Sequence, residues 1–417
     1  MKAAFFFALI VHLFCASPCR GQDSIAVREV VMHNSTYKDF VISGKTLYGL
    51  TKGDSLIIWD IRKERVDRAV AGITAVAKGN NGKILCSISS GEILEVSGKK
   101  EGKMIMRSLP NAMIYNMVID SEGHPALITN KGMFYKDSLY VPPPEIPVYN
   151  KMGNSRRTNA ISRPNVVFLD GEQRVWLGYD RGEWDGDLCF FSLENKQFTS
   201  GTYLDLKYMD KYAPKNDTLS YYQRYKTYMP TFTDLQNEYP DDIKMVGSDT
   251  LKRLQYVANF NHLQGVAQDR SGNLLVSNCP SRSFIGGDLI LLKGDGVFYK
   301  SIRLKSLLRH KLYINPRTNK TRAEVEEEPQ AITLNPYDKS IYYYSNDGFF
   351  KLIEEDGSYR TQFILAPYIN WVPVFPNAGH YRVRVPKFEF VSRDKFVFLT
   401  NSNGIGYYNG REVVYFR

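Results

Sequence analysis

The feature that most constrains this chain is a pattern that recurs along most of its length. Each copy contains a short apolar strand, a polar turn, a second strand, a break of small residues with Gly, and a third strand. The clearest copy reads VVFLDGEQRVWLGYDRGEWDGDLCFFSLENKQF, residues 166–198. Repetition on this scale is typical of stacked β units that cannot bury their apolar faces alone, so it predicts the architecture before any single residue does.

Seven stretches fit this template. Their first turns, such as NNGK, DSEG and DRSG, contain Asn, Asp and Gly, which tolerate the positive φ of tight hairpins. In some copies a candidate fourth strand follows: KMIMRSL, VFYKSIRL, YRTQFIL or REVVYF. The seven stretches are residues 40–62, 73–97, 114–138, 166–198, 265–293, 331–354 and 388–409.

Four-stranded antiparallel units repeated around an axis are the blades of a β-propeller, so we predict an all-β fold of this kind. Seven copies predict seven blades. Six or eight are the alternatives, depending on whether a weak copy is a blade and whether the interval before residue 265 contains another. Propellers usually close by pairing the two chain ends in one blade. We therefore expect SIAVREVVM (24–32) to lie beside EVVYF (412–416).

The first 22 residues have the pattern of a secretory signal peptide. Lys2 supplies a positive charge, residues 3–14 are apolar, and the stretch CASPCRGQ is small and polar. The apolar run is too short to cross a bilayer. We expect residues 23–417 to form a single exported propeller domain, periplasmic or extracellular at the cell surface, with no transmembrane segment.

Charge and cysteine content narrow the partners and the compartment. Loss of Lys2 and Arg20 with the signal peptide lowers the formal charge from +10 to +8. The basic residues are interleaved with acids rather than gathered in a stripe, which argues against nucleic acid. Of the three remaining cysteines, Cys86, Cys189 and Cys279, we expect buried thiols, with a Cys189–Cys279 bridge as the alternative. We expect a monomer.

The blade pattern resembles the repeats of bacterial two-component-regulator-type propellers and, more loosely, NHL-like repeats. Those repeats have an Asp-containing turn, a Gly, an aromatic-Gly-Thr strand end and a further Gly. The match is best at Asp170, Gly171, Trp176, Gly178 and Gly182, and continues at Asp269, Gly272 and Asn273. Elsewhere the Trp and Thr positions have become Leu, Ile, Tyr, Ser or Asn. The resemblance implies the fold and leaves the function open.

Three insertions interrupt the repeats, at about 139–163, 199–262 and 366–386. The first is rich in Pro and then in basic residues, which indicates an extended crossing segment. The second is dense in Tyr, and the third carries Trp371, His380 and Tyr381. Function in propellers resides in loops on one face of the scaffold, so we expect these segments either to bind a ligand or to cover that face.

The run YDRGEWDGD in the fourth copy has the most suggestive chemistry. It combines an aromatic platform with carboxylates, which suits sugar or peptide recognition. The matching loop of the fifth copy, NCPSRSFIGGD, adds Asn278 and Arg282 at a neighbouring position. The alternative is two solvated turns. The candidate ligand-binding residues are Tyr179, Asp180, Arg181, Glu183, Trp184, Asp185, Asp187, Asn278 and Arg282.

We expect a binding or scaffold module for a carbohydrate or a protein partner, with no cofactor. The alternative is a propeller enzyme. A glycosidase would use Asp185 and Asp187. A calcium-dependent lactonase or lyase would hold calcium on oxygens from Asp180, Asp187, Asn278 and Asn346. No nucleophile or zinc motif is present in the sequence, so no catalytic or metal-ligating set can be assigned.

Overall fold

A computed structural model gives the structure of part of the chain. It describes residues 25–31, 35–79, 81–96, 102–107, 111–143, 149–152, 156–180, 186–200, 202–205, 263–278, 288–294, 298–303, 313–314, 321–322, 329–345, 348–355, 358–365, 367, 384–401 and 403–417. All regular structure within these ranges is β-strand.

The strands form seven four-stranded antiparallel sheets, two of which gain a fifth, parallel strand. Blade 1 has β2 (Tyr37–Ser43), β3 (Thr46–Thr51), β4 (Ser55–Asp60) and β5 (Arg65–Ala71); blade 2 has β6 (Ile73–Lys78), β7 (Ile84–Ile88), β8 (Glu92–Val96) and β9 (Lys103–Arg107); blade 3 has β10 (Ile114–Ile119), β11 (Pro125–Thr129), β12 (Gly132–Tyr135) and β13 (Ser138–Tyr140). Blade 4 has β16 (Val166–Leu169), β17 (Arg174–Asp180), β18 (Gly186–Ser192) and β19 (Gln197–Ser200); blade 5 has β21 (Leu263–Gln268), β22 (Leu274–Asn278), β23 (Asp288–Gly294) and β24 (Phe298–Arg303). Blade 6 has β27 (Ile332–Leu334), β28 (Ile341–Ser345), β29 (Gly348–Glu355) and β30 (Ser358–Leu365); blade 7 has β31 (Lys387–Ser392), β32 (Lys395–Leu399), β33 (Ile405–Tyr408) and β34 (Glu412–Phe416).

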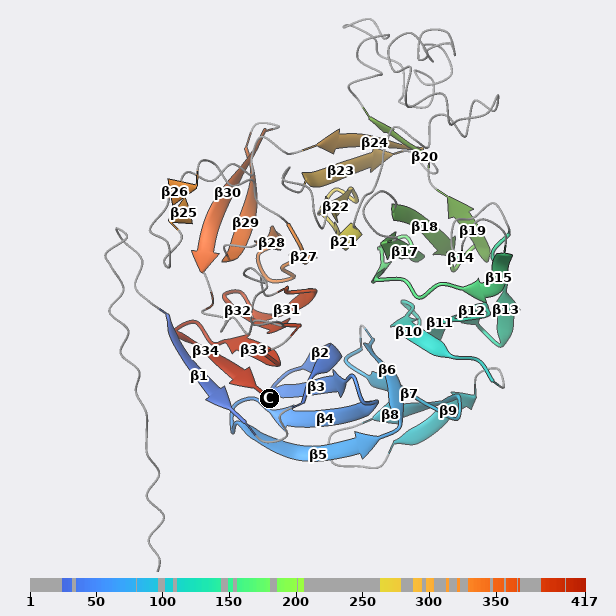
Figure 1. Ribbon diagram of the computed structural model, residues 1–417, viewed down its shortest axis with the longest axis horizontal. Helices are drawn as coiled ribbons and strands as arrows, with labels where there is room; N and C mark the ends of the chain where they lie inside the picture. Colours follow the sequence, from blue (N-terminus) through green and yellow to red (C-terminus); the bar gives the residue numbers. More distant parts are fainter. Residues whose placement is uncertain are drawn as a thin grey trace, which may run out of the picture.

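The seven sheets close into a ring (Figure 1). The first strand of each blade contacts the first strand of the next, and the circle is completed by β31 against β2. The prediction of a seven-bladed β-propeller is therefore confirmed. All four candidate fourth strands are also confirmed, as β9, β24, β30 and β34.

The core lies between the blades rather than inside any one of them. Seven clusters of buried apolar side chains are present, and each joins two adjacent blades. Because side chains alternate across a strand, successive residues point to opposite neighbours. In β22, for example, Leu274 and Val276 pack in the cluster with blade 4, whereas Leu275 packs in the cluster with blade 6. A single blade therefore has two apolar faces and needs a partner on each.

The turns between first and second strands are organised by Asp or Asn side chains. The Oδ1 of Asp120, of Asp170 and of Asp269 each accepts two backbone N–H groups of its own turn, at 2.7–2.9 Å. Asn335 accepts the N–H of Tyr337 in the same manner. The Asp and Asn residues noted in the repeat therefore satisfy turn backbone groups.

The break after the second strand has an equally local cause. Thr129 Oγ1 accepts from the N–H of Gly132 and donates to its carbonyl, and Thr400 donates to Gly404 in the same way. A Cβ at Gly132 would lie 2.3 Å from the carbonyl oxygen of Tyr140, and one at Gly404 would lie 2.3 Å from that of Phe416. The hydroxyl closes the turn, and the glycine allows the backbones to approach.

The chain ends meet as expected. β1 (Ala26–Val30) pairs in parallel with β34 along its whole length, on the outside of blade 7. Blade 5 has a comparable addition, because β20 (Thr202–Asp205) pairs in parallel with β24. Blade 7 thus contains all four strands of its own repeat, and the N-terminal segment covers its outer edge.

An ion-pair network links β1 to blade 7 and blade 1. The Arg28 guanidinium donates to both carboxylate oxygens of Glu412, each at 3.0 Å, and also pairs with Glu64 in the turn between β4 and β5. The hydrogen bonds from Arg28 lower the pKa of Glu64 and of Glu412. Because these folded-state values lie below the ordinary carboxyl value of 4.5, their contribution to stability is present above that pH and is lost as the pH falls through the folded values.

We predict that Arg28→Gln lowers the free energy of unfolding by about 1 kcal/mol at pH 7, since the three side chains are partly exposed. The difference from the wild type should shrink as the pH falls below about 4.5 and vanish once the pH is below the lowered folded-state pKa values of both carboxylates. Urea titrations at several pH values measure it. Arg62→Gln, at an exposed arginine of the same turn, is the matched control, and an equal loss in both variants would contradict the prediction.

The insertions are described in part. Residues 139–163 were expected to be an extended crossing segment, but they include an antiparallel hairpin of β14 (Tyr149–Met152) and β15 (Arg156–Ile161). A further two-stranded pair consists of β25 (Tyr313–Ile314) and β26 (Thr321–Arg322). Most of 199–262 and of 366–386 lies outside the described residues, as do the expected signal peptide and Cys279.

Strand directions place every long insertion at one face. Within a blade, the connections between the second and third strands and those leading to the next blade lie at the same end. We call this end the insertion face. β13, β20 and β30 run towards it, and β16, β21 and β31 start from it, so all three insertions leave and rejoin the described strands there. The opposite face has the short Asp- and Asn-based turns.

Candidate ligand-binding site

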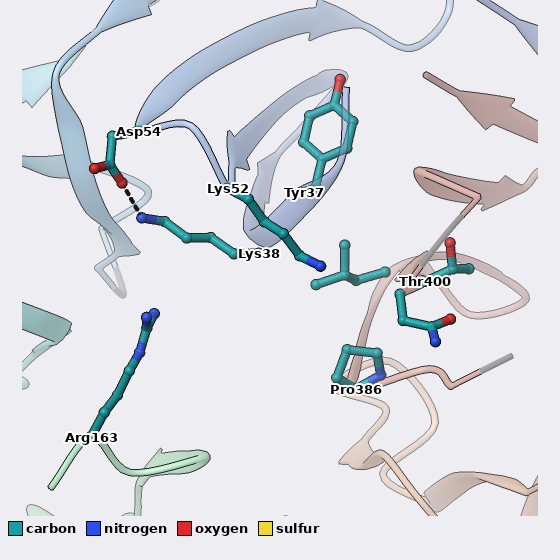
Figure 2. Close-up of a pocket in the computed structure, with 9 residues that line it drawn as sticks. Tyr37, Lys38, Lys52, Asp54, Arg163, Pro386 and Thr400 are labelled. Carbon is teal, nitrogen blue, oxygen red and sulfur yellow. Dashed lines mark hydrogen bonds and ion pairs between the residues drawn. The ribbon is translucent and has the colours of Figure 1, made fainter. Parts of the chain in front are cut away.

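A cavity of about 610 Å³ opens on the insertion face, at the inner ends of the blades (Figure 2). Its volume is within the range of small-ligand sites. Blade 1 and blade 7 provide most of the wall, and a residue preceding blade 4 completes it. The lining residues are Tyr37, Lys38, Lys52, Asp54, Arg163, Pro386, Leu399, Thr400 and Asn401.

The wall next to blade 1 is built by an irregularity in β2. A register shift between Tyr37 and Asp39 interrupts the pairing of β2 with β3. Tyr37 packs inward with 2% exposure, and its hydroxyl accepts from Trp59 Nε1 at 3.3 Å. Burial raises the pKa of Tyr37 to about 12, so this side chain is a neutral wall of the cavity.

The charged groups of the cavity are predominantly positive. The ammonium of Lys38, whose side chain is 17% exposed, forms an ion pair with Asp54. Lys52 and Arg163 are exposed, and neither makes an ion pair with any residue that the structure describes. In Figure 2 the Arg163 side chain extends towards the Lys38–Asp54 pair, and Lys52 points towards blade 7. In the described lining, three cations and one carboxylate leave an excess of two positive charges.

The charges on neighbouring inner strands are arranged differently. Lys387 Nζ lies 2.8 Å from Asp39 Oδ1 and also donates to the carbonyl of Phe40. Lys78 Nζ lies 3.0 Å from Glu389 Oε1. Although burial alone would lower it, the charges of Asp39 and Glu389 raise the pKa of Lys387 above its ordinary value. These lysines have carboxylate partners within the protein, in contrast to Lys52 and Arg163 at the cavity.

The sequence-predicted site lies on the same face, at blades 4 and 5, and the structure describes four of its nine residues. Tyr179 is buried with 2% exposure in the core between blades 3 and 4. Asp180 is exposed at the end of β17, and Asp187 is half-buried opposite Tyr179. Asn278 is buried at the end of β22, and its Oδ1 accepts no hydrogen bond from any residue that the structure describes. Arg181, Glu183, Trp184, Asp185, Arg282 and also Asn346 lie outside the described residues.

Sequence reasoning did not identify the cavity. Lys38, Lys52 and Arg163 belong to no motif: the two lysines lie in blade 1 and Arg163 lies far along the chain, just before blade 4. In the sequence the basic residues are interleaved with acids, so nothing marks these three as a group. A local signal exists only at Lys52 and Asp54, which lie in a tight turn where Asp54 has a φ of 56°. That signal indicates turn geometry rather than binding.

One group on the opposite face has the ligand types of a metal site. Donor atoms of Asp120, Glu122 and His124 lie within 4.8 Å of one another. They already have partners in the protein: the Tyr135 hydroxyl donates to Asp120 at 2.6 Å, Lys136 pairs with Glu122 at 2.9 Å, and His124 Nδ1 lies 3.2 Å from both carboxylates. The three side chains therefore stabilise a turn through hydrogen bonds and ion pairs within the protein.

Comparison with known proteins gives the fold alone. No protein-family model matches the chain, and no curated protein matches it in sequence. Selenomethionine-substituted virginiamycin B lyase from Staphylococcus aureus is 11% identical to this chain. The match covers 82% of this chain and 83% of the lyase, with a TM-score of 0.39. The RRP9 WD40 repeats are 8% identical over 89% and 88%, with a TM-score of 0.47. YCF48 bound to D1 peptide is 11% identical over 88% and 90%, with a TM-score of 0.42.

The propeller architecture rests on the sheets themselves, and these distant similarities add no argument to it. The resemblance to two-component-regulator-type and NHL-like repeats stays a prediction. In the described part of the chain, no helix has the length and hydrophobicity needed to cross a membrane.

Proposed function

We propose that this protein is an exported binding module that holds a carbohydrate or a segment of a protein partner in the cavity of the insertion face. The observation that carries the proposal is the position of this cavity. It lies at the centre of the ring, on the face from which every long insertion leaves the described strands. A rigid scaffold with variable segments around a central cavity is the arrangement that propellers use for ligand binding.

The residues of the cavity favour binding over catalysis. Among the nine described residues that line it, Asp54 is the one carboxylate, and it forms an ion pair with Lys38. Hydrolysis of a glycoside requires two carboxyl groups with different protonation states, and calcium requires several converging oxygens. The alternative function therefore depends on other residues: Asp185 and Asp187 for a glycosidase, or Asp180, Asp187, Asn278 and Asn346 for a calcium-dependent lactonase or lyase.

A variant that fills the cavity tests the proposal. We predict that Lys52→Trp abolishes binding to the glycans or peptides that the wild-type protein retains on an array, because an indole at this position occupies the opening. Lys45→Trp is the matched control, since Lys45 is an exposed lysine in a tight turn of the same blade at the opposite face. Binding that survives Lys52→Trp would place the ligand elsewhere. Thermal stabilisation by calcium, lost in Asp187→Asn, would favour the enzyme.

A further inference from the structure

The cations of the cavity point to the chemistry of its ligand. We propose that the cavity selects an acidic peptide segment of a protein partner, with two carboxylates held by Lys52 and Arg163. This inference rests on the proposed function, because it assigns a ligand class to the same cavity. The inference goes beyond the proposed function because it requires a negatively charged ligand. Carbohydrates and protein segments are not negatively charged as a rule.

The first support is the state of the cations themselves. Lys52 and Arg163 lie on opposite sides of the opening in Figure 2, and neither is paired with a carboxylate in the described part of the chain. The nearby inner-strand lysines, Lys78 and Lys387, both have carboxylate partners. Among the residues that the structure describes, these inner-strand lysines are therefore neutralised, whereas the two cations at the cavity form no ion pair. Cations grouped around a concave opening focus the field and attract anions.

The second support is the Lys38–Asp54 pair between them. Lys38 has most of its side chain buried, and its ammonium is held by Asp54. Asp54 thereby compensates the least exposed of the three cations and leaves the two exposed ones. The excess of two positive charges matches two carboxylates rather than one.

The third support comes from geometry and the remaining lining. The planar guanidinium of Arg163 can bind a carboxylate through two parallel hydrogen bonds, whereas Lys52 acts as a point charge. Pro386, Leu399 and Thr400 supply a wall that a peptide stem can contact. Recognition of a sugar ring generally uses an exposed aromatic face, but Tyr37, the one aromatic ring in the described lining, is 2% exposed. These features favour an acidic peptide over an acidic sugar.

The test measures fluorescence anisotropy of labelled hexaglutamate, with hexaglutamine, trigalacturonate and inorganic phosphate as competitors. We expect hexaglutamate to bind, and more weakly as the salt concentration rises. The double variant Lys52→Glu/Arg163→Glu should bind it roughly tenfold to a hundredfold more weakly, and Lys52→Arg should retain binding. Both residues are exposed and make no ion pair with described residues, so the double variant should keep the melting temperature of the wild type.

The matched control is Lys45→Glu/Arg62→Glu, which changes the net charge equally at an exposed lysine and an exposed arginine of the opposite face. An equal loss of binding in this control would show non-specific attraction and overturn the inference. Stronger competition by trigalacturonate would replace the peptide with an acidic sugar, and equally strong competition by phosphate would reduce the site to one for small anions. If an array ligand is neutral and is lost in Lys52→Trp while hexaglutamate does not bind, the acidic ligand fails and the proposed binding function stands.

Discussion

Deletion of residues 412–417 is expected to unfold the whole ring. The deletion removes β34. Four side chains of this strand are each at most 1% exposed: Val413, Val414, Tyr415 and Phe416. Val413 and Tyr415 pack in the cluster with blade 6, whereas Val414 and Phe416 pack in the cluster with blade 1. Burial of each such side chain contributes about 2 to 3 kcal/mol, so the loss is on the order of 10 kcal/mol, comparable to the entire stability of a typical domain.

The deletion also removes the pairing partner of β1, which forms its ladder with β34 alone. The result to measure is thermal unfolding followed by circular dichroism, where we expect the cooperative transition of the full chain to be lost. Deletion of Arg417 alone is the control, because it leaves β34 intact and removes one backbone hydrogen bond to Val30 and an ion pair with Glu29. A chain ending at Arg411 that melts cooperatively at the wild-type temperature would contradict the prediction.

The fold could be predicted from the sequence because its determinants are local and repeated. Apolar alternation, Asp or Asn in the first turn, and a hydroxyl followed by glycine after the second strand recur from blade to blade. Each has an identifiable partner in the structure, such as Glu172 and Arg174 N–H groups for Asp170. Closure through the chain ends was predictable because both segments are apolar strands flanking the first and last repeats, and β1 and β34 do pair.

The candidate site was less predictable for two physical reasons. The cavity combines Lys38 and Lys52 of blade 1 with residues of blade 7 and with Arg163 before blade 4, and only the closed ring brings these distant segments together, which leaves no local pattern in the sequence. Tyr179, in contrast, lies on the same face of β17 as Val175 and Leu177, and all three pack in the core between blades 3 and 4. The strand alternation continues into the run that looked like a binding loop, so this Tyr follows the core pattern.

Replacement of Asp170 by Ala is expected to be among the most destabilising single substitutions in the described structure. The Asp170 carboxylate is fully buried and accepts four hydrogen bonds. Oδ1 accepts from the backbone N–H groups of Glu172 and Arg174, each at 2.9 Å. Oδ2 accepts from Arg174 Nε at 2.7 Å and from Trp176 Nε1 at 2.8 Å. Trp176 is itself fully buried in the cluster between blades 4 and 5, so the carboxylate joins the turn to the core.

Alanine at this position removes the buried carboxylate that accepts hydrogen bonds from Arg174 Nε and Trp176 Nε1. Removal of one partner of a buried pair costs about 3 to 5 kcal/mol, and we expect a loss of this size in the free energy of unfolding measured by urea titration. Asp170→Asn should recover only part of the lost free energy, because its NH₂ group replaces one of the two acceptors.

Asp269→Ala is the matched control, since Asp269 forms the same turn in blade 5 but is half-buried. Its Oδ2 accepts from Asn273 Nδ2 rather than from a buried Arg and Trp. There we expect about 1 kcal/mol. Equal losses at the two positions would show that the turn, and not its buried link to Trp176, determines the stability of these blades.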